Sequence, residues 1–254
     1  MSQDSLQHSR LPDLPDIWHE TLGWQPDAGH LLEFQSLYDR IVDANTQFNL
    51  TRIVEAEEFW EKHLWDSLRG VSCVLRGEVF PEGDAEKYRA IDIGTGAGFP
   101  GFPLAIARPD IEVMLLDSTR KKVNFLQQLA EELGMENIKT MTARAEKVGR
   151  QSCDRESYDL ALARAVGPAS VCLEYALPLL KIGGMAILYR GHWTEEETEK
   201  LSTTAAQLGG VISTVEAFTT PLTRGVRNCL YLSKIKPTPA QFPRAVGLPK
   251  QKPL

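Results

Sequence analysis

The chain has 254 residues, of which 43% are hydrophobic and 24% are charged, the composition of an ordinary globular protein. These values exclude a disordered chain, a collagen-like fibre and a disulfide-stapled miniprotein, and no apolar run approaches the roughly 20 residues of a membrane-spanning helix. The net charge is −6, yet residues 217–254 carry seven basic residues and no acidic one. A local basic field can steer a polyanion, so this segment is either an RNA contact or a solvated tail.

The N-terminal residues and the cysteines predict the cellular compartment. Residues 1–11 show no basic patch followed by an apolar run, so we expect no secretory signal. The four cysteines are far apart and form no CxxC pair, which indicates a reducing cytosol and no structural zinc. We therefore expect a cytoplasmic, monomeric protein that has no metal site and no membrane contact.

The N-terminal part predicts a helical cap before the first strand. Residues 1–30 contain prolines and tryptophans with little periodicity, so they read as an irregular or briefly helical lead-in. Two apolar stripes follow, at 31–42 and 60–75, each with the spacing of one helix face. Residues 76–88 are polar and contain proline and glycine, which predicts a connector.

From residue 89 onward, strands alternate with helices. The expected strands are 90–93, 112–116, 137–141, 158–163, 185–189, 211–216 and 228–233. The expected helices are 103–107, 120–133, 170–180 and 195–208. This alternation predicts an α/β fold with a mostly parallel seven-stranded sheet and helices on both faces.

The whole chain is expected to be one domain. It would comprise an N-terminal extension (1–75), a core (89–233) and a basic, proline-rich tail (234–254) that is neither helix nor central strand. The last two strands have no helix between them. They should pair as a hairpin that places an antiparallel strand at one edge.

The sharpest motif is a glycine-rich loop directly after the first expected strand, AIDIGTGAGFPG. Gly94, Gly96 and Gly98 stand at alternate positions, and glycines let a backbone approach a nucleotide-like ligand at the strand ends. Phe99 replaces the third glycine of the dinucleotide fingerprint, and no phosphate-binding lysine follows. With Asp92 before it, the loop is similar to the first motif of S-adenosylmethionine-dependent methyltransferases. This resemblance implies that the α/β fold is the Rossmann-like fold of those enzymes and that the chain is a single methyltransferase domain. The alternative is a structural turn without a ligand.

Two further positions support an adenosine-containing ligand. Asp117, followed by Ser118, ends the second strand, where a carboxylate can bind ribose hydroxyls or simply cap a helix. Ala145 and Glu146 follow the third strand, in the loop that flanks the adenine in this architecture. Glu146 could instead be a surface charge.

The fourth strand ends at Arg164, where a methyl acceptor should lie. The sequence lacks the Asn/Asp-Pro-Pro-aromatic tetrapeptide of exocyclic-amine enzymes and the Pro-Cys of cytosine-C5 enzymes. Guanine N7 needs neither, because its lone pair carries no proton and transfer requires mainly alignment. No catalytic base is therefore predicted, and Arg164 either orients the acceptor or forms a salt bridge.

Several motifs together resemble the RsmG (GidB) family of bacterial 16S rRNA guanine-N7 methyltransferases. Beside the glycine loop they are NLT (49–51), HLWDSL (63–68), LDS (116–118), RA (164–165) and FPRAVGLPKQKPL (242–254). The resemblance implies S-adenosyl-L-methionine as donor, contacted by Gly94, Phe99, Ala145, Glu146 and Arg164. It also implies a target guanine in the decoding-region loop of 16S rRNA, in free rRNA or an assembling subunit. Arg190 stands where the family usually has lysine, so it joins Arg164 as a candidate for positioning the acceptor.

Basic residues near the donor side are the expected RNA contacts, because phosphate contacts position a substrate without reading its sequence. They are Arg120, Lys121, Lys122, Arg224, Arg227, Arg244, Lys250 and Lys252. His63, Asp66 and Ser67 share one face of an expected helix and either tie the cap to the core or border the site. A nicotinamide-dependent oxidoreductase and a non-catalytic RNA-binding module are the alternative functions.

Overall fold

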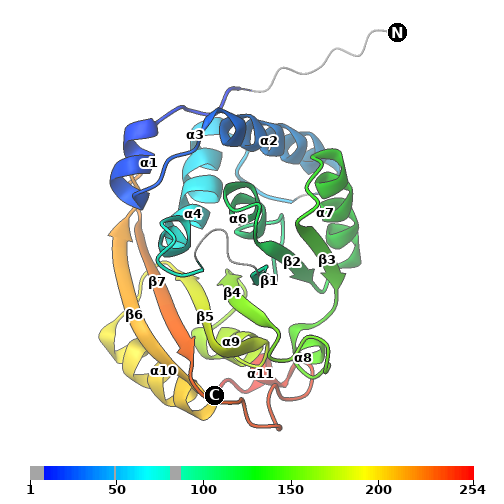
Figure 1. The fold of residues 1–254 in the computed structure, drawn as a ribbon, viewed down its shortest axis with the longest axis vertical. Coiled ribbons are helices and arrows are strands. Elements are labelled where there is room, and N and C mark those ends of the chain that lie inside the picture. The colour runs from blue at the N-terminus through cyan, green and yellow to red at the C-terminus, as the bar shows by residue number, and fades with distance from the viewer. Residues whose placement is uncertain (1–8, 49, 81–86) are drawn as a thin grey trace.

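The computed structural model describes residues 9–48, 50–80 and 87–254, with residues 46–48 placed by their backbone alone. Seven strands form one sheet with helices on both faces (Figure 1). The strands are β1 (Arg89–Ile93), β2 (Glu112–Asp117), β3 (Ile138–Thr142), β4 (Tyr158–Arg164), β5 (Leu180–Arg190), β6 (Gly210–Thr219) and β7 (Val226–Lys234). All seven expected strands are present, and the expected fold class is confirmed.

Helices surround the sheet and form the N-terminal cap. The cap helices are α1 (Pro15–Leu22), α2 (Ala28–Phe48), α3 (Ala56–Phe59), the π-helix η1 (Trp60–Trp65), α4 (Asp66–Gly70) and α5 (Ser72–Leu75). The others are α6 (Gly101–Ala107), α7 (Arg120–Glu132), α8 (Ala145–Val148), α9 (Ala169–Ala176), α10 (Glu195–Gln207) and α11 (Leu248–Gln251). Among the described helices, none combines the length and apolar character needed to cross a membrane.

The strand order is β3-β2-β1-β4-β5-β7-β6, and the first five strands are parallel. The chain builds outward from β1 in one direction and then returns to place β4 on its other side. In open sheets of this kind, ligands bind beyond the C-terminal strand ends at this switch point. The final hairpin forms as expected, but its antiparallel strand β7 lies between β5 and β6 rather than at the edge.

Alternate residues of the central strands face two separate hydrophobic layers, as the pleat of a strand requires. In β4, Leu160 and Leu162 join the layer that contains the cap, α6 and α7. Ala161 and Ala163 join the opposite layer, beneath α9 and α10. The cap therefore shares a hydrophobic core with the sheet.

Three helical expectations need correction. The helix expected at 170–180 ends at Ala176, because β5 already begins at Leu180. The proline-rich tail does contain one helical turn, α11, with Pro249 in its first turn, where the missing N–H has no helical partner to lose. The second cap stripe is interrupted by η1. Asn49 of the NLT motif and residues 81–86 of the connector lie outside the described residues.

Candidate functional site

A pocket of about 190 Å³ opens where β1, β2 and β3 end. We call it the strand-tip pocket. Five predicted donor-site residues line it: Gly94, Asp117, Ser118, Ala145 and Glu146. The sequence did not assign its remaining residues to the donor: Ile93, Leu116, Ala143, Arg144, Val166, Tyr175 and Lys250.

The glycine loop shapes one wall of the strand-tip pocket. Gly94 and Gly96 adopt left-handed backbone conformations, with φ of 69° and 62°. A Cβ added at Gly94 would lie 3.0 Å from the Val166 side chain, which leaves little room at the base of the pocket. At Gly98 it would lie 2.3 Å from the Phe102 ring. Gly94 therefore lines the pocket, whereas Gly98 is required for packing inside the protein.

Asp92 stabilises the glycine loop by hydrogen bonds and does not line the strand-tip pocket. Its Oδ2 accepts hydrogen bonds from Thr95 Oγ1 (2.6 Å) and from Gly101 N (2.9 Å). Burial raises the pKa of Asp92 to about 6, although both hydrogen bonds act in the opposite direction. Its buried Oδ1 has no partner among the described residues.

Asp117 joins the glycine loop to the start of α7. Its Oδ1 accepts from Thr119 N (2.8 Å) and its Oδ2 from Gly96 N (3.2 Å). Thr119, and not Asp117, occupies the N-cap position of α7, so the alternative reading of Asp117 as a simple helix cap is wrong. The carboxylate is set at the pocket wall by two backbone N–H groups.

Glu146 is engaged by the protein itself. Its Oε1 accepts from Tyr175 Oη (3.2 Å) and Gly247 N (3.0 Å), and Arg144 pairs with it at 3.1 Å. Burial acts to raise the pKa of Glu146, but the hydrogen bonds from Arg144 and Gly247 prevail and lower it. All three groups bind Oε1, and Glu146 lines the strand-tip pocket, so the expectation that this carboxylate reads the adenine edge stays a prediction.

A second pocket, of about 260 Å³, lies on the other side of the β4 end. We call it the arginine pocket. Its lining includes Arg164, Arg190, Arg227, Asn228 and Asp66. Between the two pockets lies the turn after β4, where a non-glycine residue, Ala165, has a φ of 56°. Such strained positions cluster at functional sites.

Arg164 is held by the cap rather than by the strand-tip pocket. Its guanidinium donates to Lys62 O at 2.9 Å and lies 3.4 Å from Asp66 Oδ2. It also approaches His63 Nδ1 at 3.3 Å. The structure therefore places Arg164, which was expected to contact the methyl donor, in the arginine pocket.

His63, Asp66 and Ser67, the cap residues for which the sequence leaves two roles open, surround Arg164. Because a guanidinium can only donate, His63 Nδ1 accepts and Nε2–H donates to Thr51 Oγ1 at 2.8 Å. Burial and the charges of Arg164 and Lys62 lower the pKa of His63 to about 3, so the ring is neutral. The ring stacks on Phe99 with a centroid distance of 4.3 Å, which explains why Phe99 is buried outside the strand-tip pocket.

The other cap residues complete this arrangement. Asp66 also pairs with Arg227 at 3.3 Å, and the Ser67 hydroxyl donates to His63 O. On the sheet side, Arg190 donates to Gly167 O at 2.6 Å, and its Nε is buried with no partner among the described residues. The cluster thus ties the cap to Arg164 of β4 and Arg227 of β7, and Tyr189 of β5 joins it by donating to Ser67 O at 2.7 Å.

The expected RNA contacts divide into two groups. Arg120, Lys121 and Lys122 form the first turn of α7, and Arg224 and Lys252 are exposed. The remaining three have contacts within the protein. Arg227 pairs with Asp66, Arg244 pairs with the buried Glu174 at 2.6 Å, and Lys250 lines the strand-tip pocket.

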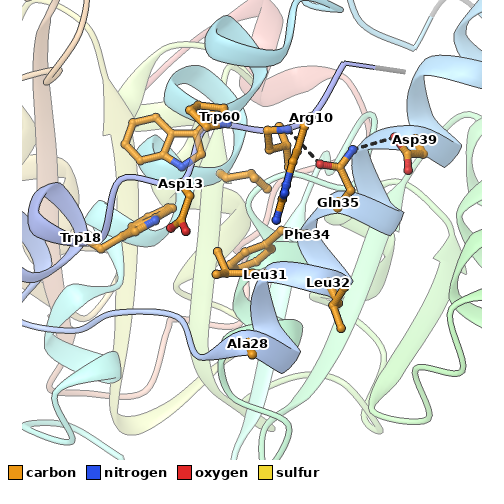
Figure 2. A pocket seen from close by; sticks show the side chains of 13 residues that line it. Arg10, Asp13, Trp18, Ala28, Leu31, Leu32, Phe34, Gln35, Asp39 and Trp60 are labelled. Atoms are coloured by element: carbon orange, nitrogen blue, oxygen red, sulfur yellow. Dashed lines mark hydrogen bonds between the residues drawn. The ribbon is translucent and has the colours of Figure 1, made fainter. Parts of the chain in front are cut away.

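A larger pocket, of about 870 Å³, lies in the cap between α1, α2 and η1 (Figure 2). Its walls are mostly apolar, with Trp18, Phe34 and Trp60 among them. Gln35 crosses it, accepting from Leu11 N at 2.8 Å and donating to Asp39 at 2.8 Å. It shares no lining residue with the strand-tip pocket. Because five of the predicted donor-site residues line the strand-tip pocket, we place the candidate site at the strand tips.

Comparison with known proteins gives a consistent picture. The family described as rRNA small subunit methyltransferase G matches residues 30–226. A protein named Ribosomal RNA small subunit methyltransferase G from Trichormus variabilis is 56% identical over 245 residues, which covers 96% of this chain and 98% of that protein. One of the same name from Nostoc punctiforme is 53% identical, with coverage of 96% and 98%.

Solved structures share the fold at low sequence identity. A branched-chain polyamine synthase variant from Thermus thermophilus, in complex with N4-aminopropylspermidine and 5′-methylthioadenosine, has a TM-score of 0.53 and 14% identity, covering 68% of this chain and 56% of that chain. A putative sarcosine dimethylglycine methyltransferase from Galdieria sulphuraria has a TM-score of 0.50 and 12% identity, covering 66% and 84%.

Proposed function

Because the chain belongs to the family of rRNA small subunit methyltransferase G, we propose that it methylates N7 of one guanine in 16S rRNA. It is an S-adenosyl-L-methionine-dependent methyltransferase of small-subunit rRNA; the base and the atom are our proposal. The observation that carries it is the pair of pockets on either side of the β4 end. One pocket has the groups that suit a nucleoside, and the other carries three arginines.

The residues of the strand-tip pocket fit the methyl donor. Gly94 brings bare backbone to the pocket floor, and Asp117 presents a carboxylate at the end of β2, where ribose hydroxyls bind in sheets of this type. Ser118 adds a hydroxyl to the polar wall, while Ala145, Ile93, Leu116 and Val166 are apolar surfaces. When bound, S-adenosyl-L-methionine supplies an electrophilic methyl group on a sulfonium.

The arginine pocket suits a nucleotide acceptor. Arg164 cannot swing freely, because Lys62 O and Asp66 fix its guanidinium, and Arg190 is fixed by Gly167 O. Planar guanidinium groups held in this way can stack on a base or donate two hydrogen bonds to a phosphate. Asn228 adds an amide, whose Nδ2 donates to Gly191 O at 2.6 Å.

Guanine N7 suits a site without a free base. His63, which contacts Arg164 of the arginine pocket, is neutral, and both its ring nitrogens are engaged by Arg164 and Thr51. A nucleophile whose lone pair carries no proton needs only to be held in line with the methyl group. The chain's task at this step is therefore orientation and charge complementarity.

The first turn of α7 supports an RNA partner. Arg120, Lys121 and Lys122 lie at the positive end of the helix dipole, and no acidic residue stands in that turn. Cations at a helix N-terminus destabilise it by about 0.3–1 kcal/mol each, so a bound polyanion would offset this unfavourable placement. We propose that the partner is 16S rRNA, free or in an assembling small subunit.

Methyl transfer to unmodified small-subunit rRNA tests the proposal. With labelled S-adenosyl-L-methionine, we expect incorporation at one guanine in the decoding-region loop, detected by reductive strand cleavage at N7-methylguanine. The matched control is the same RNA with 7-deazaguanosine at that position, which lacks the N7 nucleophile and should receive no label. Label on another base, or transfer to the 7-deaza substrate, would contradict the proposed acceptor atom.

A further inference from the structure

The C-terminal segment is built into the protein rather than trailing from it. Phe242 is buried in the layer beneath α9 and α10. Arg155 donates to Phe242 O at 2.8 Å, and Arg150 donates to Pro243 O at 2.7 Å. The Arg244 guanidinium pairs with the fully buried Glu174 of α9. These bonds fix the course of the segment before it reaches the strand-tip pocket.

The next residues bring the segment to the pocket wall. Gly247, with a φ of 84°, donates its N–H to Glu146 Oε1 and begins α11. Pro249 is buried, and α11 packs on α9 (Figure 1). The single turn of α11 therefore has a fixed orientation, and it presents Lys250 as part of the lining of the strand-tip pocket.

Lys250 differs in its pairing from the other charged residues of this pocket. Arg144 and Glu146 neutralise each other at 3.1 Å, and Asp117 is held by two backbone N–H groups. The Lys250 ammonium forms no hydrogen bond or ion pair with another residue that the structure describes. An ammonium held by a docked turn beside this wall has hydrogen-bonding capacity left for a ligand.

We propose that Lys250 is a binding residue for the adenosine part of the methyl donor, which makes the C-terminal segment one wall of the donor site. The adenosine part is favoured because the polar residues that share the pocket stand at the ends of β2 and β3, where ribose and adenine lie in sheets of this type. This inference rests on the proposed donor site, and it reassigns Lys250 from RNA contact to donor contact.

Calorimetric titration of the full-length protein with S-adenosylhomocysteine and with 5′-methylthioadenosine tests this role. The second compound keeps the nucleoside but lacks the amino-acid part. Lys250→Met should raise the Kd of both compounds by about two- to fivefold, the range expected for a charged interaction of an exposed side chain. Lys250→Arg should retain affinity to within about twofold, because the cation remains.

The matched control is Lys252→Met, two residues on, exposed and outside the pocket lining. It should leave both Kd values unchanged, and thermal unfolding of the unliganded variants should confirm that they fold alike. The proposal is overturned if Lys250→Met leaves both affinities unchanged, or weakens S-adenosylhomocysteine alone, which would assign the lysine to the amino-acid part. Neither titration contains RNA, so a failed rRNA methylation assay would not affect this result.

Discussion

His63 shows how a single buried side chain connects the cap to the site. It lies in η1, stacks on Phe99 of the glycine loop and accepts from Arg164 of β4. Three segments that are far apart in the sequence therefore meet at one imidazole. Any change in its charge would place a second cation beside the Arg164 guanidinium.

This arrangement predicts a pH-dependent loss of stability. The folded pKa of His63, about 3, lies below the ordinary value of 6.5, so below pH 6.5 the unfolded chain binds a proton that the folded chain excludes. The free energy of unfolding should therefore fall by about 2 kcal/mol between pH 7 and pH 5 from this residue. Urea unfolding of His63→Gln at both pH values should show the smaller dependence.

The control for this experiment is His192→Gln, at an exposed loop position, which should keep the full pH dependence. Asp92 acts in the opposite direction, because its raised pKa of about 6 makes the folded chain bind a proton between pH 3.8 and 6. That contribution is common to all three proteins and cancels in the comparison. An equal pH dependence in wild type and His63→Gln would show that the histidine is not held neutral.

At the scale of single residues, the sequence predicted those site residues whose position depends only on their neighbours along the chain. The positions of Gly94 and Asp117 follow from spacing along one strand–loop–helix unit, and both line the strand-tip pocket. Glu146 was also predicted and lines the pocket, but its hydrogen bond from Gly247 N spans 101 residues and could not be predicted from the sequence. Which side chains face a ligand depends on such distant partners.

Among the elements, η1 and the β6–β7 turn are joined by one buried carboxylate. Glu61 is fully buried and accepts from Leu222 N at 2.6 Å and from both the N–H and the hydroxyl of Thr223. These hydrogen bonds lower the pKa of Glu61 although burial acts to raise it. The tie holds the hairpin that carries Arg224 and Arg227 against the cap.

Glu61→Gln should destabilise the protein by about 1–2 kcal/mol, because the neutral amide accepts weaker hydrogen bonds than the carboxylate and its NH2 group cannot accept from the Thr223 hydroxyl. Glu58→Gln is the control: that carboxylate is 45% exposed and pairs with Lys62 on the surface, so its loss should cost less than about 1 kcal/mol. Urea unfolding measures both. Hydrogen exchange at Leu222 and Thr223 should accelerate in Glu61→Gln alone; slow exchange there would refute the tie.

Whether a helix or strand could be predicted depends on whether its own residues show a recognisable pattern. Strands and long helices have an apolar period, which is why β1 to β7 and α7 were predicted to within a few residues, apart from the longer ends of β5 and β6. A π-helix has nearly the same apolar stripe as an α-helix, so η1 could not be distinguished. The turn α11 is stabilised by its packing on α9, and no local pattern records that.

For the whole molecule, the proposed RNA contact of the basic first turn of α7 predicts how RNA binding should depend on salt. The triple variant Arg120→Ala, Lys121→Ala, Lys122→Ala should bind small-subunit rRNA more weakly and reduce the slope of log K against log salt by about 2–3, since each lost phosphate contact removes roughly one released counterion. Its thermal stability should be equal or higher, because cations leave the positive end of a helix dipole.

Lys200→Ala is the control for that experiment, because this lysine is exposed on α10 and pairs with Glu196. It should leave both affinity and slope unchanged. An unchanged slope in the triple variant would mean that the rRNA does not contact α7.

The sheet order also has a consequence for the way the chain is made. Synthesis delivers β6 before β7, but β6 is attached to the sheet only through β7. While residues 210–219 are already outside the ribosome, they have no strand to pair with, and the edge of β5 is open. Unpaired edges of this kind invite contact with other chains. The turn between the two strands must therefore close quickly, and a slow step between β6 and β7 would expose the nascent protein to aggregation.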